Sequence, residues 1–475
     1  MYLTRIVCLL LPALLLAGCG GQGPGTGSGN PGPVGECGAT AQKQYVLAQA
    51  REWYLFPELL PASVDPAAFA TATELLDALT ATARAQGRDR FFSFITSINA
   101  EQQVLAAGES AGFGVSLLTL SGPARVVLSQ VFAASAAADA GLERGDTLLA
   151  IGTSAATLEP IETILARPNG LSEALGPSTA GVVRVLRWRT VAGLTPEASI
   201  TKRSFSLDPV PANGIRLIQR PGLAPVGHVT LRSFISPADN ALRAAFETFR
   251  VNNVRDVIID LRYNGGGLVS TAELLLNLLA GTRTNEVSYA LRLSPAKRGD
   301  QRENPVLLTP LAQSLPTLQI ALITTAQSAS ASELVINSLT PYARVAIVGS
   351  RSFGKPVGQF AFDIAACDLR LRLVTFKTVN RNGDGDYFNG LPDAAFGNSG
   401  GFACAAADDF TRLPGNAAEG MTAEALSWIN SGVCTAAPVA GRPDAIAGAE
   451  TQNLKSAIEA ATARSALHQY MPGTY

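Results

Sequence analysis

Short apolar runs alternate with helical patterns through the C-terminal half of the chain. Four runs have the length of buried strands, at residues 226–231, 254–261, 318–325 and 345–349. Helical patterns follow the first three runs, and the first of these helices begins at Ser236 with a proline in its first turn. This alternation predicts parallel βαβ units in an α/β region covering residues 206–435.

Three unusual polar motifs come directly after these predicted strands. They occupy residues 262–267, 327–333 and 350–359. Because the carboxyl ends of parallel strands lie along one edge of a sheet, where active sites usually form, we expect the three motifs to meet there.

Residues 37–107 have helical periodicity instead. The first helical pattern contains the aromatic residues Trp53, Tyr54 and Phe56, and a second pattern spans residues 67–85. We predict a small helical N-terminal domain, in which no catalytic group of residues is recognisable.

Residues 108–205 change to β-like patterns. An Ala-rich helical stretch at 134–142 contains a glycine at its end, and a turn then leads into a strand at 147–151. A glycine-flanked loop precedes the first β-like run and consists of Gly112, Phe113, Gly114 and Val115. We predict a separate β-rich domain.

The first 19 residues are typical of an export signal. Arg5 precedes an apolar run at 6–16 that is too short to span a bilayer permanently. The run ends in L-A-G-C, which resembles the lipobox of bacterial lipoproteins and implies lipidation of Cys19. An ordinary secretory signal with an incidental cysteine is the alternative. Residues 20–36, rich in Gly, Pro and Ser, predict a flexible tether.

Composition and charge narrow the class of protein. A chain of 475 residues is too long for one ordinary core, and 47% hydrophobic with 16% charged residues excludes disorder for most of it. A net charge of −1 means that the chain has no excess of positive charge with which to bind a nucleic acid. Only two histidines are present, which argues against His-rich metal sites, so we expect neither a metal nor a cofactor.

Four cysteines lie beyond the leader, namely Cys37, Cys367, Cys404 and Cys434. In an oxidising compartment an even number predicts two structural disulfides, and the absence of CxxC spacing argues against zinc. We predict the pairs Cys367–Cys404 and Cys37–Cys434, while the other two pairings of these residues stay open.

The serine-rich motif at 327–333 has a physical reason to be nucleophilic. A serine at the mouth of a helix lies beside free N–H groups and the positive end of the helix dipole, which stabilise an oxyanion. Glycines at 265–267 allow a second N–H to approach. Lys355 lies in a strand-end loop, and burial lowers the pKa of a lysine towards that of a general base. A helix cap and a simple turn are the alternative explanations.

The three motifs, in this order, resemble those of the C-terminal processing (tail-specific) serine peptidases. They are DLRYNGGG at 260–267, SASASEL at 328–334 and FGKPVGQ at 353–359. The resemblance implies a crotonase-like α/β core with Ser330 as nucleophile, Lys355 as general base and Gln359 orienting the lysine. It also implies an oxyanion hole formed by the backbone N–H groups of Gly266 and Ala331. A glycine replaces the proline often found before the glycine pair, which leaves open which glycine of the loop donates.

A second resemblance concerns the β-rich domain. The pattern A-x-x-A-G-L-x-x-G-D-x-L-L-x-I at 137–151 is similar to PDZ domains of bacterial proteases. In such domains the loop corresponding to residues 112–115 captures the C-terminal carboxylate of a peptide, which adds a strand to the sheet. The alternative is that the glycines only shape a tight turn.

Residues 380–386 partly mimic a calcium loop. Leu391 stands where a calcium loop needs a bidentate glutamate, so a β-hairpin turn is favoured.

Together the patterns predict an α/β multi-domain lipoprotein with a helical domain, a PDZ-like domain, a peptidase core and a tail at 436–475. We expect a membrane-tethered serine endopeptidase that cleaves proteins presented by their free C-termini. In lipoproteins of this type, an Asp after the lipidated cysteine is linked to retention in the inner membrane. Gly20 stands at this position, so we expect the protein on the periplasmic face of the outer membrane. One rival is an inactive or weakly active peptide-binding lipoprotein that uses the same groove. Another is a crotonase-fold relative acting on thioesters, which would need no PDZ domain.

Overall fold

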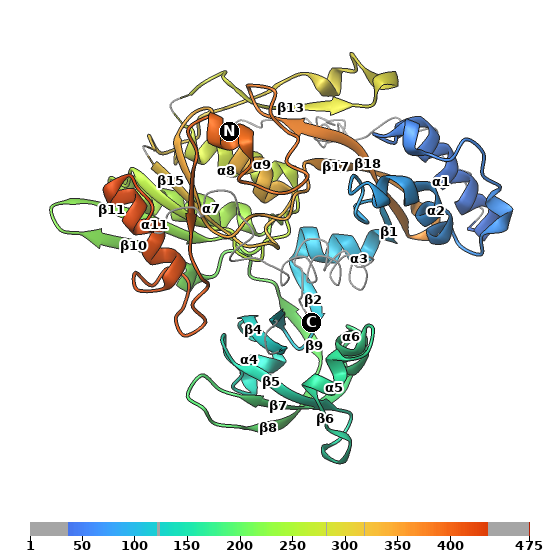
Figure 1. Cartoon of the computed structure of the whole chain (residues 1–475), viewed down its shortest axis with the longest axis horizontal. Helices are drawn as coiled ribbons and strands as arrows, with labels where there is room; N and C mark the ends of the chain where they lie inside the picture. Colours follow the sequence, from blue (N-terminus) through green and yellow to red (C-terminus); the bar gives the residue numbers. More distant parts are fainter. Residues whose placement is uncertain (1–36, 121–123, 282, 318, 436–474) are drawn as a thin grey trace, which may run out of the picture.

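The computed structural model describes residues 37–120, 124–281, 283–317 and 319–435, together with Tyr475 (Figure 1). The predicted leader and tether, including Cys19, lie outside the described residues, as does the predicted tail except for Tyr475. No helix in the described part of the chain has the length and hydrophobicity needed to cross a bilayer.

A six-stranded sheet forms the centre of the 206–435 region. Its order is β10-β11-β12-β15-β16-β19; the strands from β11 to β19 are parallel, and β10 is antiparallel to β11. The strands are β10 (Ile215–Arg220), β11 (Leu223–Thr230), β12 (Asp256–Asp260), β15 (Gln319–Thr324), β16 (Arg344–Gly349) and β19 (Phe402–Ala405). The four predicted runs coincide with β11, β12, β15 and β16, which confirms the parallel βαβ arrangement.

Helices cover both faces of this central sheet because successive residues of its buried strands point to opposite sides. In β12, Val257 and Ile259 join the core beneath three helices, whereas Ile258 joins a smaller core beneath one. The three helices are α7 (Ala238–Val251), α8 (Val269–Leu279) and α9 (Ala331–Leu339); α11 (Gly420–Ser431) lies on the other face, and α10 (Ala394–Asn398) precedes β19.

The predicted helical region shares its core with the peptidase region. Helices α1 (Ala39–Trp53) and α2 (Ala72–Ala85) pack in one apolar cluster with two long strands, β17 (Val357–Ile364) and β18 (Leu369–Val379). Figure 1 shows both helices beside these strands. Strand β18 belongs to a five-stranded antiparallel sheet with β17, β1 (Phe94–Ser97), β13 (Val287–Leu293) and β14 (Val306–Leu307). Residues before 108 therefore form part of the surroundings of Lys355.

Residues 109–206 form a separate β-rich unit, which lies below the rest of the molecule in Figure 1. Its main sheet contains β3 (Val115–Leu120), β4 (Arg125–Val131), β5 (Thr147–Gly152), β7 (Val183–Arg189) and β8 (Glu197–Thr201), with the short β6 (Glu159–Pro160) beside β5. Two strands, β2 (Glu109–Gly112) and β9 (Arg203–Ser206), pair at the entry and exit of the unit. Its helices are α4 (Ala136–Asp139), α5 (Ile161–Leu165) and α6 (Gly170–Leu175), whereas α3 (Ile98–Gln102) precedes it.

The predicted disulfide pairing is wrong. The bonds are Cys37–Cys367 and Cys404–Cys434. Cys367 lies in the turn between β17 and β18, against which the N-terminal helices pack. Cys404 lies on β19 of the central sheet and shares an apolar cluster with α11. Cys434 comes shortly after the end of α11. Cys367 and Cys404 are thus associated with different sheets, although they are consecutive cysteines in the sequence.

Residues 380–386 form a turn closed by Asn380. Its side-chain oxygen accepts hydrogen bonds from the N–H groups of Asn382 and Asp384, at 2.9 and 3.0 Å. The predicted turn is confirmed, but it is not the hairpin of two strands, because β18 ends at Val379 and a loop and α10 follow.

Candidate active site

Ser330 lies at the N-terminal end of α9, in an unusual backbone conformation. Its φ of 56° and ψ of −112° place a non-glycine residue in a region that L-residues rarely adopt. The conformation is held from two sides. The Ser330 N–H donates to Glu333 at 2.9 Å, and the preceding Ala329 N–H donates to the Asn264 carbonyl at 3.0 Å. The loop after β15 is thereby fixed against the loop after β12.

Glu333 joins the two halves of the site. Its fully buried carboxylate also accepts hydrogen bonds from the Ser352 hydroxyl at 2.5 Å and from the N–H groups of Gly354 and Lys355, each at 2.7 Å. Burial raises the pKa of Glu333, while these hydrogen bonds act in the opposite direction. One carboxylate therefore positions both the serine loop and the lysine loop.

Glu333 is a positioning residue to which the sequence analysis gave no role. A signal for it was present, because Ser330 and Glu333 have the S-x-x-E spacing in which the glutamate bonds back to the backbone at a helix start. The spacing predicts the bond to Ser330, but it does not predict the bonds to Gly354 and Lys355.

Lys355 is buried, with 5% of its surface exposed. Burial lowers its pKa to about 8, although the nearby carboxylates of Asp89 and Glu333 act in the opposite direction. Its ammonium nitrogen lies 5.1 Å from the centre of the Phe92 ring. Within the described residues this nitrogen has no hydrogen bond and no ion pair, so the amine is available to a partner in the cavity before it.

Ser330, Lys355 and Gln359 line one cavity of 230 Å³. The cavity is also lined by Ala331 and Leu334 of α9 and by Phe376 of β18. The Gln359 amide donates to the Phe92 carbonyl at 2.9 Å, and across the described part of the chain it makes no hydrogen bond with Lys355. The predicted nucleophile and base thus face the same space, while the orienting role of Gln359 stays a prediction.

The glycine loop approaches Ser330 closely. A Cβ on Gly266 would lie 2.8 Å from the Ser330 Cβ and 2.9 Å from the Ala331 nitrogen, and the Gly266 φ is +105°. Only glycine fits such a contact. The Gly266 N–H donates to the Asn264 side chain at 2.9 Å. The N–H groups of Gly267 and Ala331 have no acceptor among the described residues, which leaves them available to an oxyanion.

The N-terminal region holds the lysine loop from the outside. The Arg90 guanidinium donates to the carbonyls of Phe353, at 3.1 Å, and Gly354. Phe92 lies beneath the Lys355 amine and accepts from Gln359. Neither Arg90 nor Phe92 was expected in the site, because the sequence separates them from Lys355 by more than half of the chain.

The loop at 112–115 holds the backbone of Tyr475. The N–H groups of Gly114 and Val115 donate to the Tyr475 main-chain oxygen at 2.9 and 3.2 Å, and the Tyr475 N–H donates to the Val115 carbonyl at 2.8 Å. The site thus contains the backbone pattern that was expected for a captured C-terminal residue, with Tyr475 of this chain in it.

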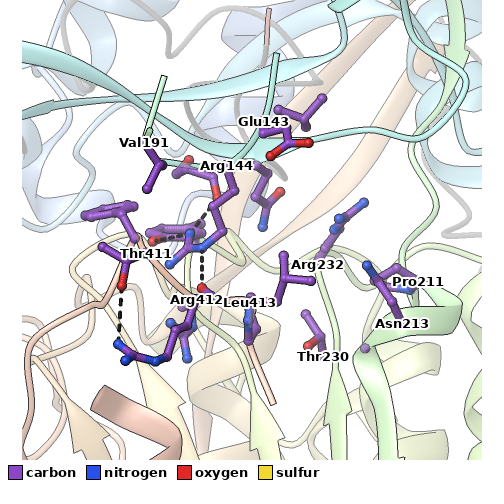
Figure 2. Close-up of a pocket in the computed structure, with 18 of the residues that line it drawn as sticks. Glu143, Arg144, Val191, Pro211, Asn213, Thr230, Arg232, Thr411, Arg412 and Leu413 are labelled. Atoms are coloured by element: carbon purple, nitrogen blue, oxygen red, sulfur yellow. Dashed lines mark hydrogen bonds between the residues drawn. The ribbon is translucent and has the colours of Figure 1, made fainter. Parts of the chain in front are cut away.

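A second cavity, of 440 Å³, lies between the 109–206 unit and the central sheet (Figure 2). Arg144 lines it and links the two parts, because its guanidinium donates to the Ser129 carbonyl, to the Tyr263 hydroxyl at 3.2 Å and to Asp408 at 2.5 Å. Tyr263 directly precedes Asn264 in the glycine-containing loop. The sequence offered no signal for this link.

Comparison with known proteins identifies relatives of both regions. The model of peptidase family S41 matches residues 225–393, and the model of the peptidase S41 N-terminal domain matches residues 41–94. A carboxyl-terminal-processing protease of Synechocystis is 25% identical over 266 residues, covering 55% of this chain and 57% of that protein. The chloroplastic carboxyl-terminal-processing peptidase 2 of Arabidopsis thaliana is 25% identical over 285 residues, covering 57% of this chain and 49% of that protein.

A solved structure is also similar. It belongs to a Bacteroides fragilis protein assigned to the S41 proteases, which is 25% identical with a TM-score of 0.60, covering 82% of this chain and 97% of that one. The chain spans about half the length of the two curated relatives.

Proposed function

Because this chain belongs to peptidase family S41, we propose that it is a serine endopeptidase with Ser330 as nucleophile and Lys355 as general base. The observation that carries the proposal is the buried Lys355 amine, which has no hydrogen bond or ion pair with any described residue and lies at the cavity that Ser330 also lines. A pKa of about 8 leaves a usable fraction of the amine neutral near pH 7.

The geometry supports a two-step acyl transfer. The neutral Lys355 amine takes the Ser330 hydroxyl proton while Oγ bonds to the substrate carbonyl carbon, and the carbonyl oxygen becomes an oxyanion. The Ala331 N–H at the start of α9 and an N–H of the glycine loop stabilise that charge. The ammonium then protonates the leaving amine as the peptide bond breaks. Water repeats the sequence on the acyl-enzyme: its proton goes to Lys355 while its oxygen bonds to the acyl carbon. The Lys355 ammonium then returns this proton to Ser330 Oγ as the ester C–O bond breaks, which releases the carboxylic acid product and restores the neutral amine.

We assign the 109–206 unit as a PDZ-like module that receives the C-termini of protein substrates. The support is the backbone pattern at residues 112–115, where two N–H groups converge on one main-chain oxygen and a carbonyl accepts from the same residue. A substrate held by its C-terminus adds a strand beside β3.

Cleavage mapping tests the proposed activity. The purified protein is incubated with an unfolded test protein, and the products are identified by mass spectrometry beside the Ser330→Ala variant. Internal cuts that require Ser330 are expected. Intact substrate would overturn the assignment in favour of a peptide-binding protein. Equal cutting by the variant would overturn the role of Ser330.

We further propose that Cys19 is lipidated and anchors the protein in the cell envelope, on the periplasmic face of the outer membrane. The support is the L-A-G-C sequence after a short apolar run. Cells producing the protein should incorporate labelled palmitate into it, and Cys19→Ala should move it from the membrane fraction to the soluble fraction. Cys8→Ala is the matched control and should leave both results unchanged. Equal membrane recovery of Cys19→Ala would contradict the anchor.

A further inference from the structure

Tyr475 occupies the groove that the proposed function assigns to substrates. Its main-chain oxygen accepts from Gly114 and Val115, and its own N–H donates to the Val115 carbonyl. Figure 1 places this chain end beside β2 and β9 at the 109–206 unit. Every backbone group of residues 112–115 that forms the pattern is therefore engaged by the chain itself.

The Tyr475 side chain is buried as well. Only 8% of the residue is exposed, and it belongs to the apolar core of the unit together with Phe113, Ala136 and Ala137. Burial raises the pKa of its phenol. The groove thus provides a deep apolar pocket for one large side chain next to the backbone site, and a pocket of this kind sets the preference for the last residue of a peptide.

Gly112 leaves room for the docked residue. A Cβ at this position would lie 2.5 Å from the Tyr475 carbonyl carbon, but its nearest other neighbour would be a Phe205 ring atom at an ordinary 3.5 Å. A methyl group here would exclude the docked chain end without disturbing the unit itself. The small side chain at 112 is accordingly needed for occupancy of the groove, and not for the local fold.

From these contacts we infer that Tyr475 of this same chain is the resident ligand of the 109–206 unit, and that substrates compete with it by presenting a C-terminal aromatic residue. This inference rests on the proposed function for its substrates. Tethering gives the resident residue an effective concentration on the order of millimolar. A groove with an intrinsic Kd near 0.1 mM for such a residue would then bind added peptide about tenfold more weakly than an empty groove.

The test separates binding from catalysis by using the full chain with Ser330→Ala in every sample. A fluorescent decapeptide ending in Tyr is titrated by anisotropy into this parent, into a Tyr475→Asp version and into a Tyr475→Phe version. The Asp version should bind the peptide about tenfold more tightly, because a charged side chain does not enter the apolar pocket. The Phe version should match the parent. The same peptide ending in Asp should bind none of them. Equal affinity for the parent and the Asp version, or no binding by either, would overturn the inference.

A second measurement reports occupancy without any added peptide. In hydrogen exchange, the amides of Gly114 and Val115, which donate to Tyr475, should be protected in the Ser330→Ala parent and should lose protection in the Tyr475→Asp and Gly112→Ala versions. Protection in the parent should be independent of protein concentration, because the ligand is in the same chain. Unprotected amides in the parent, or protection that disappears on dilution, would refute docking within one chain. Failure of cleavage by the Ser330-intact enzyme would leave these readouts unchanged and would count only against the proposed activity.

Discussion

Ser330 and Lys355 are held in place by different means. Ser330 is fixed locally, by its own α9 and by the loop after β12, in a backbone conformation that its neighbours impose. Lys355 depends on distant parts of the chain, since Phe92 and Arg90 from the N-terminal region cover its loop. Glu333 contacts both loops through its side chain, and the Phe353 N–H also joins them by donating to the Ser328 carbonyl at 2.9 Å. The position of the proposed nucleophile therefore depends on one supersecondary unit, whereas the position of the proposed base depends on the assembled molecule.

The largest effect is expected from removing either member of the pair. Ser330→Ala and Lys355→Ala should each lower kcat/KM by about 10⁴-fold or more, because the two groups act as one unit. Steady-state cleavage of a fluorogenic peptide measures this loss, with circular dichroism as the check on folding. Residual activity above a few per cent in a folded variant would contradict the pair.

Glu333→Gln should be the most damaging change outside the pair. The glutamine side chain has the same size, but its N–H₂ group would face backbone N–H groups that donate to a carboxylate oxygen in the native protein. Donors would then face donors, so we expect both loops to shift. We expect kcat to fall about 100-fold, as a displacement of about 1 Å can cause, with a loss of about 2–4 kcal/mol in unfolding free energy.

Glu273→Gln serves as the matched control for Glu333→Gln, because Glu273 lies on α8 and bonds to the Tyr289 hydroxyl away from the site. It should leave kcat nearly unchanged in the same assay. Equal loss in both variants would show that Glu333 acts only through general stability.

The pH profile isolates the base. Only the neutral amine accepts a proton, so kcat/KM should rise with pH up to a midpoint near 8 and should fall about tenfold per unit below it. Asp89 favours the charged form of Lys355, so Asp89→Asn should move the midpoint to lower pH. A midpoint that stays in place in a folded Asp89→Asn variant would show that the N-terminal region does not tune the base.

The smallest effect is expected from opening Cys37–Cys367 with a double serine substitution. The bond attaches the start of the N-terminal region to the β17–β18 turn, so its loss should loosen the cover over Lys355 and lower kcat several-fold. Stability should fall by about 2–5 kcal/mol. The double substitution at Cys404 and Cys434 should lower stability with little change in kcat, and non-reducing peptide maps should contain these two pairs. Equal kcat losses in both double variants would contradict the proposed cover.

The difference between the local contacts of Ser330 and the distant contacts of Lys355 also explains which features the sequence could predict. The apolar runs at β12, β15 and β16 are local signals, and parallel pairing then places Ser330 at the sheet edge. Arg90, Phe92 and the disulfide pairing depend on packing between segments that are far apart in the sequence, for which no local pattern exists. The bond between Ser330 and Glu333 follows from their local S-x-x-E spacing, whereas the positive φ of Ser330 and the bonds of Glu333 to Gly354 and Lys355 had no such signal in the sequence.

The Cys37–Cys367 bond turns most of the molecule into a covalent ring that spans 330 positions of the sequence. Ser330, Lys355 and the whole 109–206 unit lie on this ring. A protease is constantly exposed to cutting by its own copies, and a single nick anywhere within a ring opens it without dividing it. On a denaturing gel, a molecule nicked once within the ring would therefore run as one band without reductant and as two bands with reductant. In the folded protein the two fragments would also stay together through the shared core.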